Sequence, residues 1–456
     1  MKQPITTTLV ALVLMSLPGA AALAQPVPAP DSPPADKPPA DKPPADVPPV
    51  DPKPAEPKPA EVKPADPKAT PPKPGDVADD NDSPSTTPAP VVLAELKRLG
   101  TVDEDLPRPL VARGGGFAIW PLALVQAQAT PYVGENASFL NGDIAEHPGF
   151  RMRRARLGVG ASWETLLKAE IQAELLTNAQ VTILLNQAWV GFTPKSYFGA
   201  YMGFLDVPFS RSSLTPAADT ALIDRPLAAR ALAPQQQLGL YVTGSLLATK
   251  LQYTLGVYNG FQRFDQFYSG YRQPNAGFGN RFDNLAYAAR LATSLDSAGP
   301  DIPTPGDRKN RLNAGASYLY SDGGARDIHA FEGDLFFQRA GFRALGEAIY
   351  STTVPESNPT QPITQTESID SYAIIVEAGY TFRKMVGAHV RFEWIDANTA
   401  VQDEADNWLL TAGLSFTPPV VGKYLKAQLE FTHREEVFGL ALENDSLTLQ
   451  TQFMLQ

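Results

Sequence analysis

The feature that most constrains the fold of this chain is a repeated alternation of apolar and polar residues from Phe117 to the end. Segments of about ten residues place apolar side chains at every second position, and turn residues separate one segment from the next. The last segment has an apolar face formed by Leu447, Leu449, Phe453 and Leu455. Its other face carries Ser446, Thr448, Gln450 and Gln452. Because neighbouring side chains of a β-strand point to opposite faces, the pattern predicts strands with one apolar and one polar face.

We count about 16 such strands, an even number within the range of bacterial outer-membrane barrels. They are expected to begin near residues 118, 149, 165, 180, 197, 236, 248, 282, 309, 327, 341, 370, 386, 406, 424 and 443. The predicted fold is all-β, a transmembrane antiparallel β-barrel. A soluble β-sandwich is the alternative, since it would bury the same apolar faces in a core. The unbroken series of hairpins and the strand length favour the barrel.

The connections between the predicted strands alternate in length. With the N-terminus in the periplasm, short turns are expected on that side and long loops outside, at 131–148, 208–235, 259–281 and 355–369. Two connections break the rule: 177–179 is short where a loop is expected, and 296–308 is long where a turn is expected. They leave open a miscounted hairpin. Aromatic residues near strand ends are predicted to form interfacial girdles: Trp120, Tyr132, Trp189, Tyr197, Phe198, Tyr201, Trp394, Trp408, Phe416 and Tyr424.

Residues 1–24 are predicted to be a cleaved signal peptide. Lys2 supplies a positive charge, an apolar run follows from Leu9 to Leu17, and Ala22-Leu23-Ala24 fits a cleavage site before Gln25. The alternative, a membrane anchor, needs roughly 20 apolar residues, and this run is shorter. Export to the outer membrane is therefore expected. The chain has no cysteine, which excludes a disulfide and a lipoprotein anchor.

Residues 25–116 are predicted to be a disordered Pro-rich spacer ahead of the barrel domain, 117–456. Units such as Pro34-Ala35-Asp36-Lys37-Pro38 repeat, and dense proline removes amide donors and fixes φ, so that helix and sheet are disfavoured. A short helix is expected at 91–99. The spacer is interpreted either as an inert tail or as a periplasmic tether whose residues 25–90 contact the cell wall, and the sequence leaves both open.

Charge and motif content narrow the function. The formal net charge is −11; residues 1–90 hold 8 Lys and no Arg against 10 Asp and 2 Glu, a balance of −4, which leaves −7 for the rest. An acidic balance argues against nucleic acid as a partner. The histidines have no metal-ligand spacing, and no motif joins a nucleophile to a base. We therefore expect no catalytic residue, no metal and no cofactor, and predict that the protein is not an enzyme.

The informative charges are basic residues on predicted polar strand faces and in the long connection 206–236. On a strand they should point into a water-filled lumen, because a charge facing lipid at mid-depth costs roughly 2–4 kcal/mol. Arginine can hold a phosphate or carboxylate through two parallel hydrogen bonds. A loop as long as 206–236 can fold inward and narrow a pore. The candidate pore-lining or anion-binding residues are Arg154, Arg156, Lys168, Arg211, Arg225, Arg230, Lys250, Arg290, Arg391 and Lys426.

With these residues in view, the chain resembles the phosphate-selective porin O and P family over roughly residues 115–456. The resemblance is carried by Phe150-Arg151-Met152-Arg153-Arg154-Ala155-Arg156-Leu157, by Gly203-Phe204-Leu205-Asp206-Val207-Pro208-Phe209-Ser210, by Ile223-Asp224-Arg225 and by Thr417-Pro418-Pro419. It implies a barrel of about 16 strands, commonly a homotrimer, with inward-folded loops and a basic lumen. It also implies that Arg154, Arg156, Arg211 and Arg225 line the lumen or its constriction.

This chain departs from the family pattern in two ways. Its barrel region is net acidic, and it ends on Gln456, whereas outer-membrane proteins usually end on an aromatic residue. Three functions are therefore carried forward. The first is a porin for small hydrophilic solutes with a preference for anions such as phosphate, in contact with outer-membrane lipid. The second is a general or cation-leaning porin. The third is a structural anchor between outer membrane and cell wall.

Overall fold

In the computed structural model the chain divides into two units, Met1–Ser83 and Pro84–Gln456, and every described residue belongs to the second. The signal peptide, the helix expected at 91–99 and nearly all of the Pro-rich spacer lie outside the described residues. The residues that the structure describes are 112–114, 116–134, 147–177, 180–247, 250–263, 267–272, 284–294, 310–356, 367–383, 385–403, 405–418, 424–439 and 441–455.

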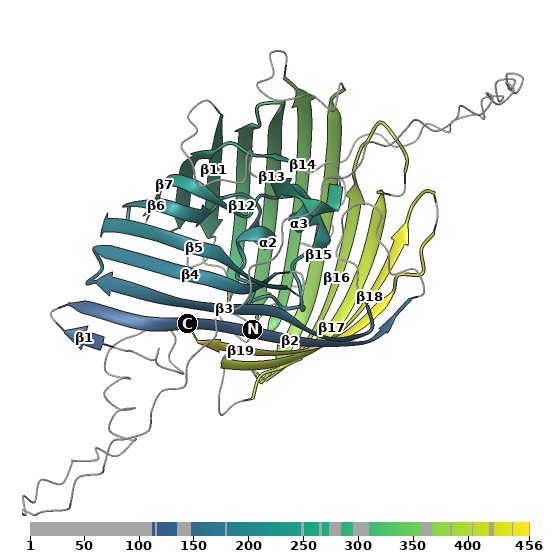
Figure 1. Cartoon of the computed structure of the whole chain (residues 1–456), viewed down its shortest axis with the longest axis horizontal. Coiled ribbons are helices and arrows are strands. Elements are labelled where there is room, and N and C mark those ends of the chain that lie inside the picture. Colours follow the sequence, from purple (N-terminus) through teal and green to yellow (C-terminus); the bar gives the residue numbers. More distant parts are fainter. Residues whose placement is uncertain are drawn as a thin grey trace, which may run out of the picture. The chain divides into compact units, whose positions relative to one another are not determined.

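Sixteen strands form one closed antiparallel barrel (Figure 1). Each pairs with the next along the chain, β8 pairs with β11 across a long loop, and β19 pairs with β2 to close the sheet. Closure rules out the sandwich, and the predicted strand starts agree with the structure to within three residues. The strands are β2 (Phe117–Val133), β3 (Gly149–Trp163), β4 (Leu167–Thr177), β5 (Gln180–Lys195), β6 (Phe198–Asp206), β7 (Gln236–Leu246), β8 (Leu251–Asn259), β11 (Leu285–Ser294), β12 (Arg311–Asp322), β13 (Arg326–Arg339), β14 (Phe342–Pro355), β15 (Ile369–Phe382), β16 (Val386–Asp396), β17 (Asn407–Phe416), β18 (Leu425–Glu436) and β19 (Ser446–Leu455).

The remaining described elements are short. Two helices, α2 (Arg211–Leu214) and α3 (Leu227–Leu232), lie between β6 and β7. The connection from β8 to β11 contains β9 (Gln262–Arg263), η1 (Phe267–Ser269) and β10 (Tyr271–Arg272). Among the described residues, no helix is long and apolar enough to cross a membrane. Finally, β1 (Ala112–Gly114) pairs with β2. The sheet therefore begins at Ala112, ahead of residue 117, where the barrel domain was predicted to begin.

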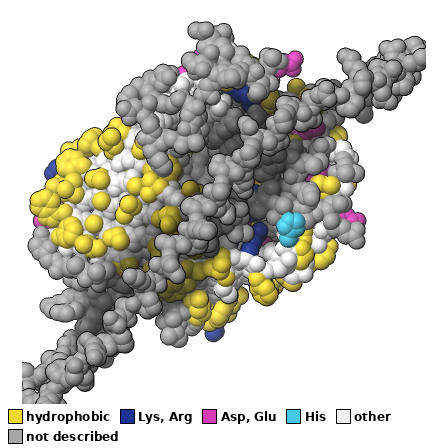
Figure 2. Space-filling view, in the orientation of Figure 1, with side chains coloured by type: hydrophobic (Ala, Val, Ile, Leu, Met, Phe, Trp, Pro, Cys, Tyr) yellow, Lys and Arg dark blue, Asp and Glu magenta, His cyan; other side chains and the backbone are white. Residues whose placement is uncertain are grey.

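The two faces of the wall follow the sequence alternation. On β19, Leu449 and Phe453 are 47% and 44% exposed on the outside, whereas Gln450 and Gln452 are buried inside. Figure 2 shows hydrophobic side chains over the visible outer wall. An apolar exterior of this kind is what a barrel in lipid requires.

Short and long connections gather at opposite ends of the barrel, here called the turn end and the loop end. At the turn end, β13 and β14 are joined by Ala340-Gly341, both with positive φ, as a tight hairpin turn requires. The two expected exceptions to the length rule are real: residues 178–179 join β4 to β5, and residues 295–310 join β11 to β12. The structure adds a third, since only residues 323–325 join β12 to β13 at the loop end. The strand count was therefore correct, and no hairpin was miscounted.

Three of the aromatic residues predicted for the outer girdles face the lumen instead. Trp120 has the same strand parity as Gln126 and Gln128, which are buried inside the barrel. Trp189 and Tyr201 pack against a buried cluster that includes α3. The prediction was wrong here because nearness to a strand end does not fix the face of a side chain. Others lie exposed on the wall: Tyr132, Tyr197, Phe198 and Phe416.

Candidate functional site

The connection between β6 and β7, residues 207–235, folds into the barrel, as its length predicted. We call it loop 3. Figure 1 shows α2 and α3 of loop 3 inside the ring of strands. Val207, Phe209, Ala228 and Leu232 are at most 1% exposed. Loop 3 therefore narrows the lumen.

Carboxylates on the inner wall hold loop 3 through its backbone and hydroxyl donors. The Ile223 amide donates to Glu430 (2.7 Å), and the Ala228 amide donates to Glu393 (2.9 Å). The Ser210 hydroxyl donates to Glu347 at 2.6 Å, and Ser210 itself has φ 66°, a strained value for a residue with a side chain. Hydrogen bonds to ionised groups are worth about 1.5–3 kcal/mol each, so these carboxylates fix the path of loop 3.

An apolar patch on the wall completes the docking of loop 3. Ile375, Ile395 and Leu409 face inward, where the alternation predicts polar residues, and they belong to one buried cluster with Leu227 and Leu232 of α3. Burying such side chains contributes about 1.5–3 kcal/mol each. The patch exists because α3 covers it.

Four of the predicted anion-binding residues serve to attach loop 3 or to neutralise the wall. Arg290 pairs with Glu332 (2.8 Å) and Asp334, and Arg211 of α2 reaches the same Asp334 (3.2 Å).

The other two of these four residues lie on β16 and β18. Arg391 pairs with Glu393 at 2.9 Å. Lys426 donates to two carbonyl oxygens of loop 3, those of Ala218 and Thr220. All four are buried and already matched by carboxylates or carbonyl groups.

Strand β3 presents a different set of arginines to the lumen. Its pairing with β2 shifts register between Gln126, which faces Arg154, and Ala127, which faces Met152, so Arg153 is an extra residue. Because such a bulge reverses the alternation, Arg151 and Arg153 point to the same side as Arg154 and Arg156. Arg151 and Arg154 donate to the lumen residues Gln128 and Gln126. We call these four side chains the arginine ladder: Arg151, Arg153, Arg154 and Arg156.

Asp224 of loop 3 lies opposite the arginine ladder. Arg153 and Arg154 pair with its carboxylate at 3.2 and 3.3 Å, and Arg156 pairs with Glu174. Burial opposes ionisation of Asp224, but Arg153, Arg154 and Arg230 outweigh it and hold the pKa of this carboxyl well below its usual range. Arg153, Arg154 and Arg156 retain 14–19% side-chain exposure, more than the anchoring arginines.

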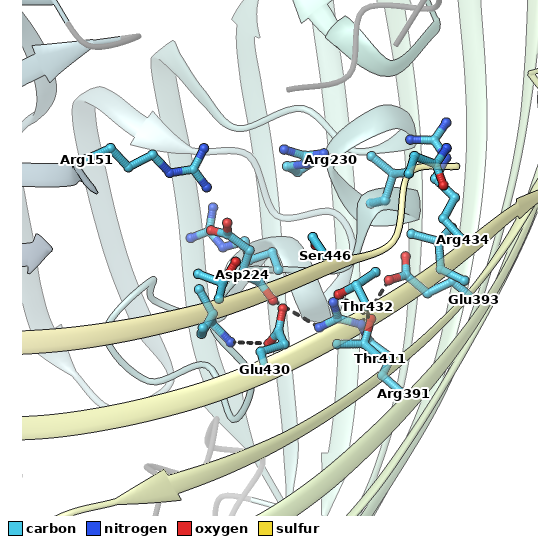
Figure 3. Close-up of a pocket in the computed structure, with 16 residues that line it drawn as sticks. Arg151, Asp224, Arg230, Arg391, Glu393, Thr411, Glu430, Thr432, Arg434 and Ser446 are labelled. Atoms are coloured by element: carbon cyan, nitrogen blue, oxygen red, sulfur yellow. Dashed lines mark hydrogen bonds and ion pairs between the residues drawn. The ribbon is translucent and has the colours of Figure 1, made fainter. Parts of the chain in front are cut away.

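Open cavities lie on both sides of this part of loop 3. One, with a volume of about 100 Å³, is lined by Arg151, Asp224 and Arg230 among others (Figure 3). The other, also of about 100 Å³, is lined by Arg156, Glu170 and Asp206 among others. Arg225 lines both. Its Nε donates to the Thr215 carbonyl (2.9 Å), and burial lowers its pKa against the opposing charge of Asp206. Arg225 therefore lies with Arg151 at one cavity and with Arg156 at the other.

The other two candidate lysines lie away from this constriction. Lys168 is exposed on the lumen face of β4, where it pairs with Ser162 of β3. Lys250 was expected on the polar face of a strand, but it lies in the turn before β8 because that strand begins one residue later. Arg151 and Arg153 were not among the predicted site residues, since strict alternation places them on the lipid face.

Comparison with known proteins agrees with this architecture. Residues 133–349 match the sequence profile of the family described as phosphate-selective porin O and P. The predicted resemblance to this family is confirmed over these residues. A channel, rather than an enzyme, is what this match supports. No curated protein sequence matches the chain significantly.

Solved structures of outer-membrane proteins share the fold of this chain at low sequence identity. The outer-membrane channel DcaP of Acinetobacter baumannii has a TM-score of 0.52 and 12% identity, covering 75% of this chain and 98% of its own. The anion-selective porin from Comamonas acidovorans has a TM-score of 0.50 and 12% identity, covering 74% and 99%. The trimer form of OmpT from Vibrio cholerae has a TM-score of 0.50 and 11% identity, covering 74% and 99%.

Proposed function

We propose that this porin conducts small hydrophilic solutes passively and favours small anions, with phosphate among them. The observation that carries the proposal is the bulge in β3, which turns Arg151, Arg153, Arg154 and Arg156 into the lumen opposite loop 3. With Arg225 and Arg230 they form the basic side of the constriction. Rings of arginine favour anions in pores, and a guanidinium can grip a phosphate with two parallel hydrogen bonds.

The net charge of −7 outside residues 1–90 supports the competing proposal of a cation-leaning general porin. The acidic residues of the inner wall contribute less negative potential along the lumen than the net charge of −7 implies. Glu347, Glu393 and Glu430 accept hydrogen bonds from loop 3, and Glu332 and Asp334 pair with Arg290. Their charge is therefore matched locally. In the arginine ladder, Arg153 and Arg154 share the single carboxylate of Asp224, and Arg156 pairs with Glu174 and lies near Asp206. Local charge along the path should decide selectivity.

Phosphate titration of single channels tests the proposal. We expect millimolar phosphate to reduce the chloride current of the wild-type protein, and the double variant Arg154→Ala, Arg156→Ala to lose most of this block. Arg339→Ala is the matched control, because Arg339 is exposed beside the β13–β14 turn, outside the lumen. Block that is equal in the double variant and in the wild type would remove the arginine ladder from the proposal.

We also propose that the porin assembles as a homotrimer, in line with the family expectation and with the trimer form of the Vibrio cholerae protein. Light scattering of the detergent-solubilised protein, corrected for bound detergent, measures the mass of the assembly. A mass of one chain would contradict the trimer.

A further inference from the structure

Three aromatic rings lie side by side on the lumen wall toward the turn end, and the constriction does not use them. Trp189 of β5 contacts Tyr201 of β6 edge-on, with ring centres 5.5 Å apart. Tyr201 stacks on Tyr241 of β7, with centres 4.9 Å apart. We call these three rings the aromatic shelf. Each is only half-buried, although each packs partly against the buried cluster at loop 3.

Glycine on the neighbouring strand makes room for one ring of the shelf. Tyr201 pairs with Gly191 of β5, and a Cβ atom at Gly191 would collide with the Tyr201 ring. The ring therefore lies down along the wall across Gly191. The Tyr201 hydroxyl lies 3.1 Å from the hydroxyl of Thr193, and the ring remains partly exposed.

A cation lies beside the shelf in the same cross-strand row. Lys168 of β4 pairs with Gly191, which in turn pairs with Tyr201, so Lys168 and Tyr201 are two strand spacings apart, roughly 10 Å between their Cα atoms. Lys168 is exposed. On the same flank, Glu170 of β4, which pairs with Trp189, lines the cavity that also contains Arg156 and Arg225. The shelf therefore borders the route to the basic constriction.

We propose that the aromatic shelf and Lys168 form a binding site in the lumen for anions that carry a flat ring face, such as aromatic carboxylates or sugar phosphates. The ring of the solute packs against the partly exposed surface of Trp189 and Tyr201, while its carboxylate or phosphate is held by Lys168 before it reaches Arg156. This inference rests on the proposed function, since it names a solute class for the same anion pathway.

Block of single-channel chloride current by benzoate and by glucose 6-phosphate tests the site, with acetate and inorganic phosphate as ring-free probes. We expect at least one ring-bearing anion to block at a concentration about three- to tenfold lower than its ring-free counterpart. Whether benzoate or glucose 6-phosphate shows the larger gain identifies the ring that the shelf prefers. Equal block by ring-bearing and ring-free anions of both pairs would overturn the proposal.

Variants separate the shelf from the constriction. Trp189→Leu should abolish the ring-dependent gain, and Trp189→Phe should retain most of it. Trp394→Leu, in which the residue faces outward and bonds to Tyr372, controls for loss of a tryptophan from the barrel. The chloride-over-potassium preference should be unchanged in all three. Wild-type anion preference without a ring-dependent gain rejects the shelf alone, whereas cation preference in the wild type rejects the proposed function itself.

Discussion

At the scale of single residues, Asp224 decides how much of the positive charge at the constriction is available to a solute. It pairs with Arg153 and Arg154, and its low pKa keeps it ionised at neutral and mildly acidic pH. We therefore predict that Asp224→Asn strengthens the preference for chloride over potassium, by up to about fivefold, since one unit charge near the path is worth about 1 kcal/mol in a water-like medium. The zero-current potential in a KCl gradient measures the change. Asp403→Asn, in the loop between β16 and β17, is the control. A weaker chloride preference in Asp224→Asn would show that the carboxylate holds the arginines in place and does not simply oppose them.

At the scale of elements, the bulge of β3 leads to a prediction that does not follow from the charge of its arginines alone. Deletion of Arg153 leaves Arg151-Met152-Arg154-Ala155-Arg156, which alternates without a bulge, so the remaining arginines should still face the lumen and the barrel should assemble. Deletion of Met152 leaves an arginine facing lipid in every register, at a cost of up to about 2–4 kcal/mol. We expect the first variant to show the heat-dependent shift in gel mobility of a folded barrel at near wild-type yield, and the second to show it at much lower yield. Equal yields would contradict the assignment of the bulge.

The same elements show what the sequence could and could not predict. The predicted strand positions were accurate because lipid on one side and the lumen on the other impose the same alternation that defines a strand. The outward face of Leu449 and the inward face of Gln450 can therefore be predicted from the neighbouring sequence alone. Alternation could not predict that Arg153 faces the lumen, although two adjacent arginines in a membrane strand themselves indicate a bulge. The inward Ile375 and Ile395 depend on contact with α3, which is more than a hundred residues away in the chain. A contact between residues so far apart in the chain cannot be predicted from a local sequence pattern.

At the scale of the whole molecule, a barrel with an acidic total charge is expected to favour anions, because its acidic side chains hold loop 3 and its accessible basic ones face the solute path. The measurement that tests this claim most directly is the zero-current potential of the purified wild-type protein in a planar bilayer under a KCl gradient. We expect a potential of the sign set by chloride. Its magnitude should decrease when Arg154 and Arg156 are replaced by alanine. A potential of the sign set by potassium in the wild-type protein would contradict the account and would leave a general, cation-leaning porin.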